Sequence, residues 1–291
     1  MARLKTIPLY LLALVLLCLP AMGAGKPRSQ KVTIMSFNIR FVTAKDTAQF
    51  SWYKRRGPVV KMIEDICPDV ISLQEHGPQW IEYLQSKLPF YDFYIPDLSG
   101  EDPLPKGYSQ VIVWQKEKYE KVDAGRFFLS DTPDSLSKGW GSNHYRNTGW
   151  VKLRSRKTGS EFYVFNTHLD HKAVDAKKNG VLLNVEMMKR IAGEDATVFI
   201  MGDMNMRRGS KTGAFLDPYY EWMESTADAA RKVYRNVTFN AYGDTAHQAE
   251  IDFIFFRNAD ALRYEVIDSP DYGVEYISDH WPIIGKYIFN N

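Results

Sequence analysis

Short apolar runs rich in β-branched and aromatic residues alternate along the chain with segments of helical periodicity. Such runs are typical of buried strands, whereas apolar residues three and four positions apart are typical of a helix packed on one face. Helical spacing predicts helices at 55–66, 78–88 and 174–191. The apolar runs predict strands at 32–37, 70–73, 91–95, 110–115, 120–128, 150–153, 162–166, 198–201, 251–256, 262–267 and 282–289.

This order of elements fits an α/β protein in which two sheets pack face to face. A sheet with one apolar face and a helix with one apolar stripe must each bury that side, so helices are expected to cover the outer face of each sheet. No linker and no change of composition divides residues 24–291. We therefore expect one domain over that range.

Residues 1–23 have the features of a secretory signal peptide. Arg3 and Lys5 precede an apolar stretch, and the small residues Ala21 and Gly23 follow it at a position suited to cleavage. The stretch is short for a membrane span, although an uncleaved N-terminal anchor is the alternative. The protein is accordingly expected to be secreted or periplasmic.

The near-neutral charge of the chain bears on which partners the protein is expected to bind. The chain has 37 Lys and Arg against 35 Asp and Glu, and loss of residues 1–23 removes two of the basic ones. A near-neutral protein is a poor candidate for a dedicated polyanion binder. Cys67 is the one cysteine of residues 24–291, so an intrachain disulfide is excluded there, and its place near a helix end predicts a buried apolar side chain.

Six apolar runs begin or end in polar side chains of four types. A side chain at the end of a strand lies at the rim of a sheet, where sites are usually built. Each residue alone could be a turn residue, a helix cap or a hydrogen-bonded core residue. Together they predict one site assembled from Asn38, Glu75, Asn166, His168, Asp203, Asn205, Asp252, Asp279 and His280.

Oxygen donors in this set indicate a hard metal ion. Glu75 and Asp279 offer carboxylate oxygens and Asn38 offers an amide oxygen. Mg²⁺ and Mn²⁺ prefer such ligands. The histidines are too few and too scattered for a zinc site with three histidines. We therefore predict Mg²⁺ or Mn²⁺ as the cofactor.

The remaining members fit a reaction at phosphorus. Asp203 is the natural general base for an attacking water, and Asn205 could orient that water if the chain stays extended. His168 and His280, as imidazolium ions, could offset charge that grows in the transition state. Asp252 is expected to hydrogen-bond His280, since a neighbouring carboxylate favours the protonated ring.

Two long loops are candidates for substrate contacts. Residues 131–148 include His144 and Arg146, for which a solvated connection is an equal alternative. His171 is ambiguous on the same grounds.

Residues 206–213 follow the Asp203 cluster directly and contain three basic residues, for which we expect a role facing phosphate. They are Arg207, Arg208 and Lys211.

These segments, taken in order, resemble the signature of the endonuclease/exonuclease/phosphatase superfamily. The resemblance rests on Ser36-Phe37-Asn38, Leu73-Gln74-Glu75, Asn166-Thr167-His168-Leu169, Gly202-Asp203-Met204-Asn205, Ile251-Asp252-Phe253-Ile254 and Ser278-Asp279-His280-Trp281-Pro282. Residues 126–134 and 144–153 further resemble a secreted bacterial subgroup. The resemblance implies a four-layer α/β/β/α sandwich of two mixed, largely antiparallel sheets with outer helices.

The resemblance also implies phosphoester hydrolysis with Mg²⁺ or Mn²⁺, and the same roles for the matching residues as above. By position, Tyr108 resembles a phosphate-contacting tyrosine of the family. With it, the expected substrate contacts are Tyr108, Arg146, Asn166 and Arg207. Arg40 departs from the pattern, because several nuclease members carry an acidic residue there.

The expected function is a secreted, metal-dependent phosphoesterase that cleaves a phosphodiester or a phosphomonoester by in-line attack of an activated water. Its substrate would be a phosphorylated small molecule, a nucleic acid or a phospholipid headgroup, and the near-neutral charge favours the first. A nuclease and a sphingomyelinase-like lipid phosphodiesterase are the alternatives, and a non-catalytic phospho-ligand binding protein is the distant one. No stable protein partner is evident, and a monomer is expected.

Overall fold

The structure is a computed structural model that describes residues 29–96, 110–268 and 272–290. The predicted signal peptide and Tyr108 lie outside these residues. Among the described helices, none combines the length and the apolar character needed to cross a membrane.

Two sheets form the centre of the molecule. Within the described residues, the first has seven strands in the spatial order β10 (Lys232–Tyr234), β12 (Asp260–Val266), β13 (Ile283–Phe289), β1 (Gln30–Asn38), β2 (Val70–Gln74), β4 (Val111–Gln115) and β3 (Tyr91–Tyr94). The second has six, in the order β5 (Tyr119–Phe128), β6 (Asn147–Ser155), β7 (Glu161–His168), β8 (Val198–Asp203), β11 (Asp252–Arg257) and β9 (Glu224–Ser225). The pairs β1–β2, β7–β8 and β10–β12 are parallel and the other pairs are antiparallel.

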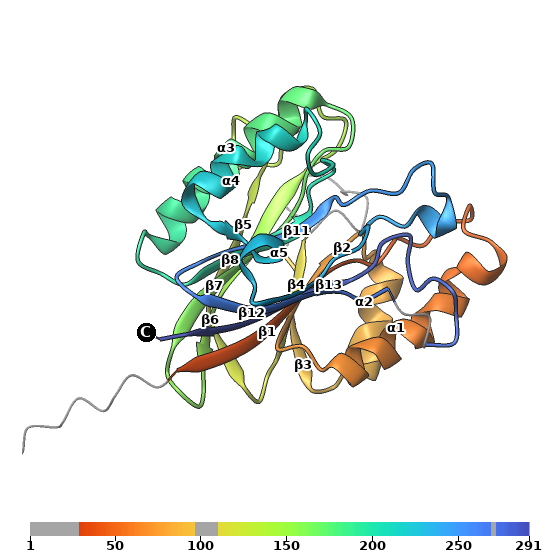
Figure 1. Cartoon of the computed structure of the whole chain (residues 1–291), viewed down its shortest axis with the longest axis horizontal. Coiled ribbons are helices and arrows are strands. Elements are labelled where there is room, and N and C mark those ends of the chain that lie inside the picture. Colours follow the sequence, from red (N-terminus) through yellow and green to blue (C-terminus); the bar gives the residue numbers. More distant parts are fainter. Residues whose placement is uncertain (1–28, 97–109, 269–271, 291) are drawn as a thin grey trace, which may run out of the picture.

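Helices cover the outer face of each sheet, on opposite sides of the molecule (Figure 1). Helices α1 (Trp52–Ile66) and α2 (Pro78–Lys87) pack on the first sheet, and α3 (Val174–Ala192) and α4 (Asp217–Trp222) pack on the second. The fold is therefore the expected four-layer sandwich of two mixed, largely antiparallel sheets. The short elements α5 (Thr226–Ala229), η1 (Ala48–Phe50), η2 (Gly213–Leu216) and η3 (Ala241–Gly243) complete the chain.

Aromatic rings join the inner faces of the two sheets. Phe199 of β8 lies 4.8 Å from Tyr287 of β13 and 6.0 Å from Phe162 of β7, measured between ring centroids. All three side chains are almost completely buried. Burial of such rings contributes about 2 to 3 kcal/mol each by area, and edge-to-face contacts add to it. This core fixes how the two sheets face each other, and with it the relative position of their ends.

The register of the second sheet brings three predicted site residues side by side. His168 pairs with Asp203 across β7 and β8, and Asp252 pairs with Asp203 across β8 and β11. Residues paired in register point to the same face of a sheet. In the first sheet, β1 ends at Asn38 and β2 ends just before Glu75. The two sheets therefore present these side chains at one end of the sandwich.

One prediction about the fold is wrong. Cys67 is exposed rather than buried, and it ends α1 as the C-cap residue in the left-handed conformation, with φ 49°. Its Sγ lies 3.3 Å from Nε2 of Gln115.

Candidate active site

Asp203 is the centre of the polar cluster at this end of the sandwich. Its Oδ2 accepts a hydrogen bond from Nδ2 of Asn38 at 3.1 Å and lies 3.4 Å from Nε2 of His168 and 3.7 Å from Nε2 of His280. Its Oδ1 accepts the backbone N–H of Asn205 at 2.8 Å. The carboxylate thus connects both sheets and both predicted site histidines.

The surroundings make Asp203 a suitable base near neutral pH. Burial, followed by the charge of Asp252, raises the pKa of Asp203 to about 7, although His280 and the N–H of Asn205 act in the opposite direction. An ideal general base has a pKa near the operating pH, because it is then both deprotonated and still basic. The predicted role of Asp203 is consistent with this environment.

The two histidines differ in charge. Burial alone disfavours a charged ring, but the charge and hydrogen bond of Asp252 raise the pKa of His280 to about 10. The Nδ1 of His280 lies 2.8 Å from Oδ2 of Asp252, as predicted. Burial and the nearby charge of Arg146 instead hold the pKa of His168 well below its usual value. Asp252 therefore favours the charged form of His280, whereas burial and Arg146 disfavour the charged form of His168.

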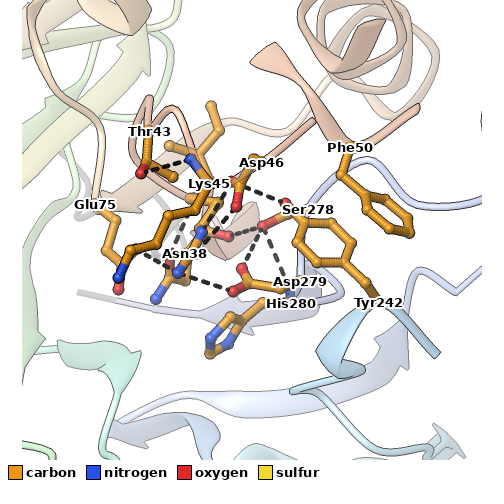
Figure 2. A network of polar contacts seen from close by, with 12 residues as sticks. Asn38, Thr43, Lys45, Asp46, Phe50, Glu75, Tyr242, Ser278, Asp279 and His280 are labelled. Atoms are coloured by element: carbon orange, nitrogen blue, oxygen red, sulfur yellow. Dashed lines mark hydrogen bonds and ion pairs between the residues drawn. The ribbon is translucent and has the colours of Figure 1, made fainter. Parts of the chain in front are cut away.

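Glu75 and Asp279 form an acidic wall beside this cluster (Figure 2), and Arg40 forms ion pairs with both carboxylates. Nη1 of Arg40 lies 3.2 Å from Oδ2 of Asp279 and 4.0 Å from Oε2 of Glu75. The same guanidinium donates to both oxygens of Asp46 at 3.1 and 3.2 Å. Asp46 therefore fixes the position of the Arg40 guanidinium.

The acidic wall fits a divalent cation. Oε2 of Glu75 is buried without a hydrogen bond among the described residues. Burial and the neighbouring charge of Asp279 raise the pKa of Glu75, although His280 and Arg40 act in the opposite direction. Asn38, whose side chain lies between Asp203 and the backbone of Arg40, completes a set of oxygen donors. Glu75, Asp279 and Asn38 are the residues that would hold Mg²⁺ or Mn²⁺.

A second group of potential ligands consists of Asp203, Asp252 and His280, whose donor atoms lie within 4.8 Å of one another. We consider it a weaker site, because Nδ1 of His280 lies 2.8 Å from Oδ2 of Asp252, which raises the pKa of the ring to about 10 and favours its protonated form. Metal binding requires a neutral imidazole. This group is better suited to handling protons.

Unusual backbone geometry positions several of these side chains. Arg40, Glu75 and Asn205 follow the ends of β1, β2 and β8 with φ values of 61°, 56° and 51°. Such conformations are strained for non-glycine residues and concentrate at functional sites. Gly202, with φ 148°, allows β8 to approach β7, since a Cβ there would lie 1.8 Å from the carbonyl oxygen of Thr167.

The polar cluster opens into a cavity of about 620 Å³. This volume is typical of sites for small molecules. Its lining consists of Arg40, Phe41, Glu75, Gly77, Gln110, His144, Arg146, His168, His171, Asp203, Asn205, Phe239, Ile251, Asp279 and His280. Asn38 and Asp252 lie behind this lining, where they contact Asp203 and His280.

Asn205 lines the cavity, but the chain there is not extended. Its left-handed backbone turns the Nδ2 group toward the carbonyl oxygen of Leu169, at 3.0 Å. The backbone N–H of Asn205, rather than its side chain, contacts Asp203.

Two predicted substrate contacts lie away from the cavity. Asn166 is completely buried between the sheets, where its amide binds Gln74, Leu73 and Val111. Arg207 is exposed and donates to the carbonyl oxygen of Gln248 at 2.8 Å.

The other two basic residues of the 206–213 loop are not cavity residues either. Arg208 pairs with Glu250 at 2.8 Å and with Asp228 at 3.0 Å, and Lys211 is absent from the lining. In the structure, local carboxylates and a carbonyl oxygen bind the two arginines of this loop, and none of its three basic residues lines the cavity.

Arg40 and His171 line the cavity although neither was predicted as a site residue. Arg40 stands two positions after Asn38 at the same strand end, and His171 stands three positions after His168. Proximity to a predicted site residue at a strand end was the available signal in both cases.

The fold and the site define a class of phosphoesterases that build one reaction centre from the ends of two packed sheets. A sequence model of the endonuclease/exonuclease/phosphatase family matches residues 35–280, which is most of the chain. The chain therefore belongs to this family, whose members are hydrolases acting on phosphoesters.

Similar structures come from Bacteroides. A family protein of Bacteroides thetaiotaomicron has a TM-score of 0.82 and 26% identity, covering 91% of this chain and 97% of that one. A mannosyl-6-phosphatase of the same species has a TM-score of 0.81 and 26% identity, covering 89% of this chain and all of that one. The uncharacterised protein L388 of Acanthamoeba polyphaga mimivirus is 25% identical over 251 residues, which is 81% of this chain and 91% of that protein.

Proposed function

We propose that this protein is a secreted, divalent-cation-dependent phosphatase that hydrolyses a phosphomonoester of a small molecule. The observation that carries the proposal is the meeting of Asp203, an imidazolium at His280 and the acidic wall of Glu75 and Asp279 in one cavity. A base, a proton-bearing donor and a cation site are the parts that hydrolysis at phosphorus requires.

Each residue has a defined task in this proposal. Asp203 takes a proton from the attacking water, and His280 donates a hydrogen bond to a phosphoryl oxygen from the ring that Asp252 keeps charged. His168, whose pKa is lowered by burial and by Arg146, donates a hydrogen bond from its ring N–H. A divalent cation held by Glu75, Asp279 and Asn38 supplies electrostatic stabilisation of the charge on the phosphoryl group.

Three observations favour a phosphomonoester of a small molecule as the substrate. A phosphomonoester carries more negative charge near neutral pH than a diester does, and the cationic side chains of Arg40 and His280 line the cavity. The similar Bacteroides protein named as a mannosyl-6-phosphatase supports the same choice. The cavity also has the volume of a small-molecule site.

Export is part of the proposal and rests on residues 1–23. Mass spectrometry of the N-terminus after expression in the host cell, with fractionation, tests it. A mature N-terminus near residue 24 in the exported fraction is expected. An intact N-terminus in the cytosolic fraction would contradict it.

The catalytic proposal is tested with p-nitrophenyl phosphate, mannose 6-phosphate and bis(p-nitrophenyl) phosphate, each with Mg²⁺, Mn²⁺ or a chelator. We expect turnover of both monoesters that chelator abolishes, with the diester at least tenfold slower. Faster turnover of the diester would instead favour a nuclease or a lipid phosphodiesterase. Monoester turnover that persists in chelator would overturn the role of the cation.

A further inference from the structure

We propose that His144, Arg146 and His171 form a subsite for a second anionic group of the substrate. This inference rests on the proposed phosphatase function and deepens it. The ligand would be a phosphorylated small molecule with a further phosphate or carboxylate, bound at the cavity wall while its reacting phosphate lies at Asp203 and His280.

The three residues belong to the cavity but not to the reaction centre. All three line it, and the rings of His144 and His171 lie 5.3 Å apart between centroids. His171 is exposed, and His144 and Arg146 are half-buried, whereas His168 is 4% exposed. The trio therefore lies toward the mouth of the cavity, outward from the reacting groups.

Positively charged side chains surround His144 and His171 in the cavity wall. Burial lowers the pKa of both His144 and His171, and Arg146, Lys172 and, for His144, Lys138 lower it further. The facing negative charge is that of Asp170. Positive groups therefore outnumber negative ones here even with both rings neutral, and neutral rings still donate hydrogen bonds.

The carboxylate of Asp170 stabilises this part of the cavity wall through hydrogen bonds. Its Oδ2 accepts the hydroxyl of Ser142 at 2.7 Å, and its Oδ1 accepts the backbone N–H groups of Lys172 and Ala173, both at 2.7 Å. The hydroxyl oxygen of Ser142 in turn accepts the backbone N–H of His144 at 3.0 Å. One buried carboxylate thus fixes the loop that carries His144 and the segment that carries His171.

The cavity is consequently divided by charge. Glu75 and Asp279 make one part of its wall acidic and suited to a cation, and the trio makes another part basic. A substrate with one phosphate uses the reaction centre alone. A second anionic group on the same molecule gains charge-assisted hydrogen bonds from His144, Arg146 and His171. Each such hydrogen bond raises the affinity for the substrate by roughly tenfold.

The test compares three hexose derivatives: glucose 6-phosphate, glucose 1,6-bisphosphate and 6-phosphogluconate. For the wild type we expect kcat/KM to be about tenfold higher for the two doubly anionic compounds, mainly through KM. Preference for the bisphosphate alone would identify phosphate as the second group, and preference for 6-phosphogluconate alone would identify carboxylate. Equal kcat/KM for all three would overturn the proposal.

The His144→Ala, His171→Ala double variant should bring the preference ratio close to one. His247→Ala is the matched control, because His247 is exposed, pairs with Asp244 and lies outside the cavity lining. An unchanged ratio in the double variant would overturn the subsite. An equal loss on all three compounds in Arg146→Gln would place Arg146 at the reacting phosphate and contradict its assignment.

Calorimetric binding separates this inference from the proposed function. If the wild type hydrolyses none of the three compounds, the phosphatase proposal fails, while binding of glucose 1,6-bisphosphate and glucose 6-phosphate in chelator still tests the subsite. Tighter binding of the bisphosphate by wild type, lost in the double variant, supports it. Equal binding of both compounds by wild type overturns it.

Discussion

Asp252 holds His280 as a buried cation. Its Oδ2 lies 2.8 Å from Nδ1 of the ring, and both side chains are at most 6% exposed. A charged group at such a depth is stable only when an opposite charge is in contact with it. The Nε2 side of the ring faces Asp203 at 3.7 Å, so the pair supplies a proton-bearing donor next to the base.

Replacing Asp252 by Asn should therefore lower the pKa of His280 and favour its neutral form. The folded-state pKa of His280 is raised to about 10, so the imidazolium is present at neutral pH and is lost as pH rises through that value. In Asp252→Asn we expect the alkaline limb of the pH–rate profile to move to lower pH, and kcat at pH 8 to fall by about 10 to 100-fold. NMR titration of the His280 ring checks the cause. An unmoved alkaline limb would refute this reading of the pair.

Asp203→Ala should remove the general base. Loss of such a group lowers kcat by about two to four orders of magnitude. Circular dichroism should show an unchanged fold, with Arg207→Ala as a control variant outside the cavity lining. Activity within tenfold of wild type would exclude Asp203 as the base.

The acid limb of the wild-type pH profile provides a second check on Asp203. The group acts when deprotonated, so activity should fall as pH drops through its pKa. Burial and Asp252 raise that pKa to about 7 without a cation. A bound cation favours the carboxylate, so the midpoint should lie at or below about pH 7. An acid limb centred well above pH 7 would contradict the assignment.

The strand ends were predictable from sequence because each chemical group directly follows or precedes a strongly apolar run. Asn38, Glu75, Asp203 and Asp279 could be located in this way, and parallel or antiparallel pairing of short buried strands then brings their ends together. The two sheets and the three longer helices follow from the same periodicity. Short elements such as α4 and α5 carry too few residues to show a period.

Apart from the predicted pairing of Asp252 with His280, the partners of the charged side chains at and near the site could not be predicted. Whether a basic residue faces substrate depends on its neighbours, and Arg208 is bound by Glu250 and Asp228, whereas Arg40 is held by Asp46 at the cavity wall. Sequence motifs likewise do not distinguish a residue that lines a cavity from one that supports it. The pKa of His168 is lowered by burial and by Arg146, which directly precedes β6.

The cation site is tested by Glu75→Gln, which keeps the size of the side chain and removes its charge. A ligand that binds the folded state raises its stability by mass action, so Mg²⁺ or Mn²⁺ should raise the Tm of wild type and chelator should reverse the rise. The shift should be largely lost in Glu75→Gln, with activity reduced at least tenfold. An equal Tm shift in both proteins would exclude Glu75 as a ligand.

Asn166 should prove to be a structural residue. Its Nδ2 donates to the carbonyl oxygens of Leu73 at 3.0 Å and Val111 at 2.8 Å, and its Oδ1 accepts from Gln74 at 2.7 Å, so one side chain of the second sheet binds two strands of the first. Asn166→Ala leaves those buried groups without partners, each at a cost of about 1 to 3 kcal/mol before relaxation. We expect urea denaturation to show a loss of about 2 to 4 kcal/mol, with KM of the residual folded enzyme within twofold of wild type.

The matched comparison for Asn166 is Arg207→Ala. Arg207 was also predicted to contact substrate, yet its side chain is exposed and binds one carbonyl oxygen, so its removal should change stability by less than about 0.5 kcal/mol. Its KM should also equal that of wild type. A several-fold rise in KM with unchanged stability, in either variant, would restore that residue to the substrate contacts and contradict the position that the structure assigns to it.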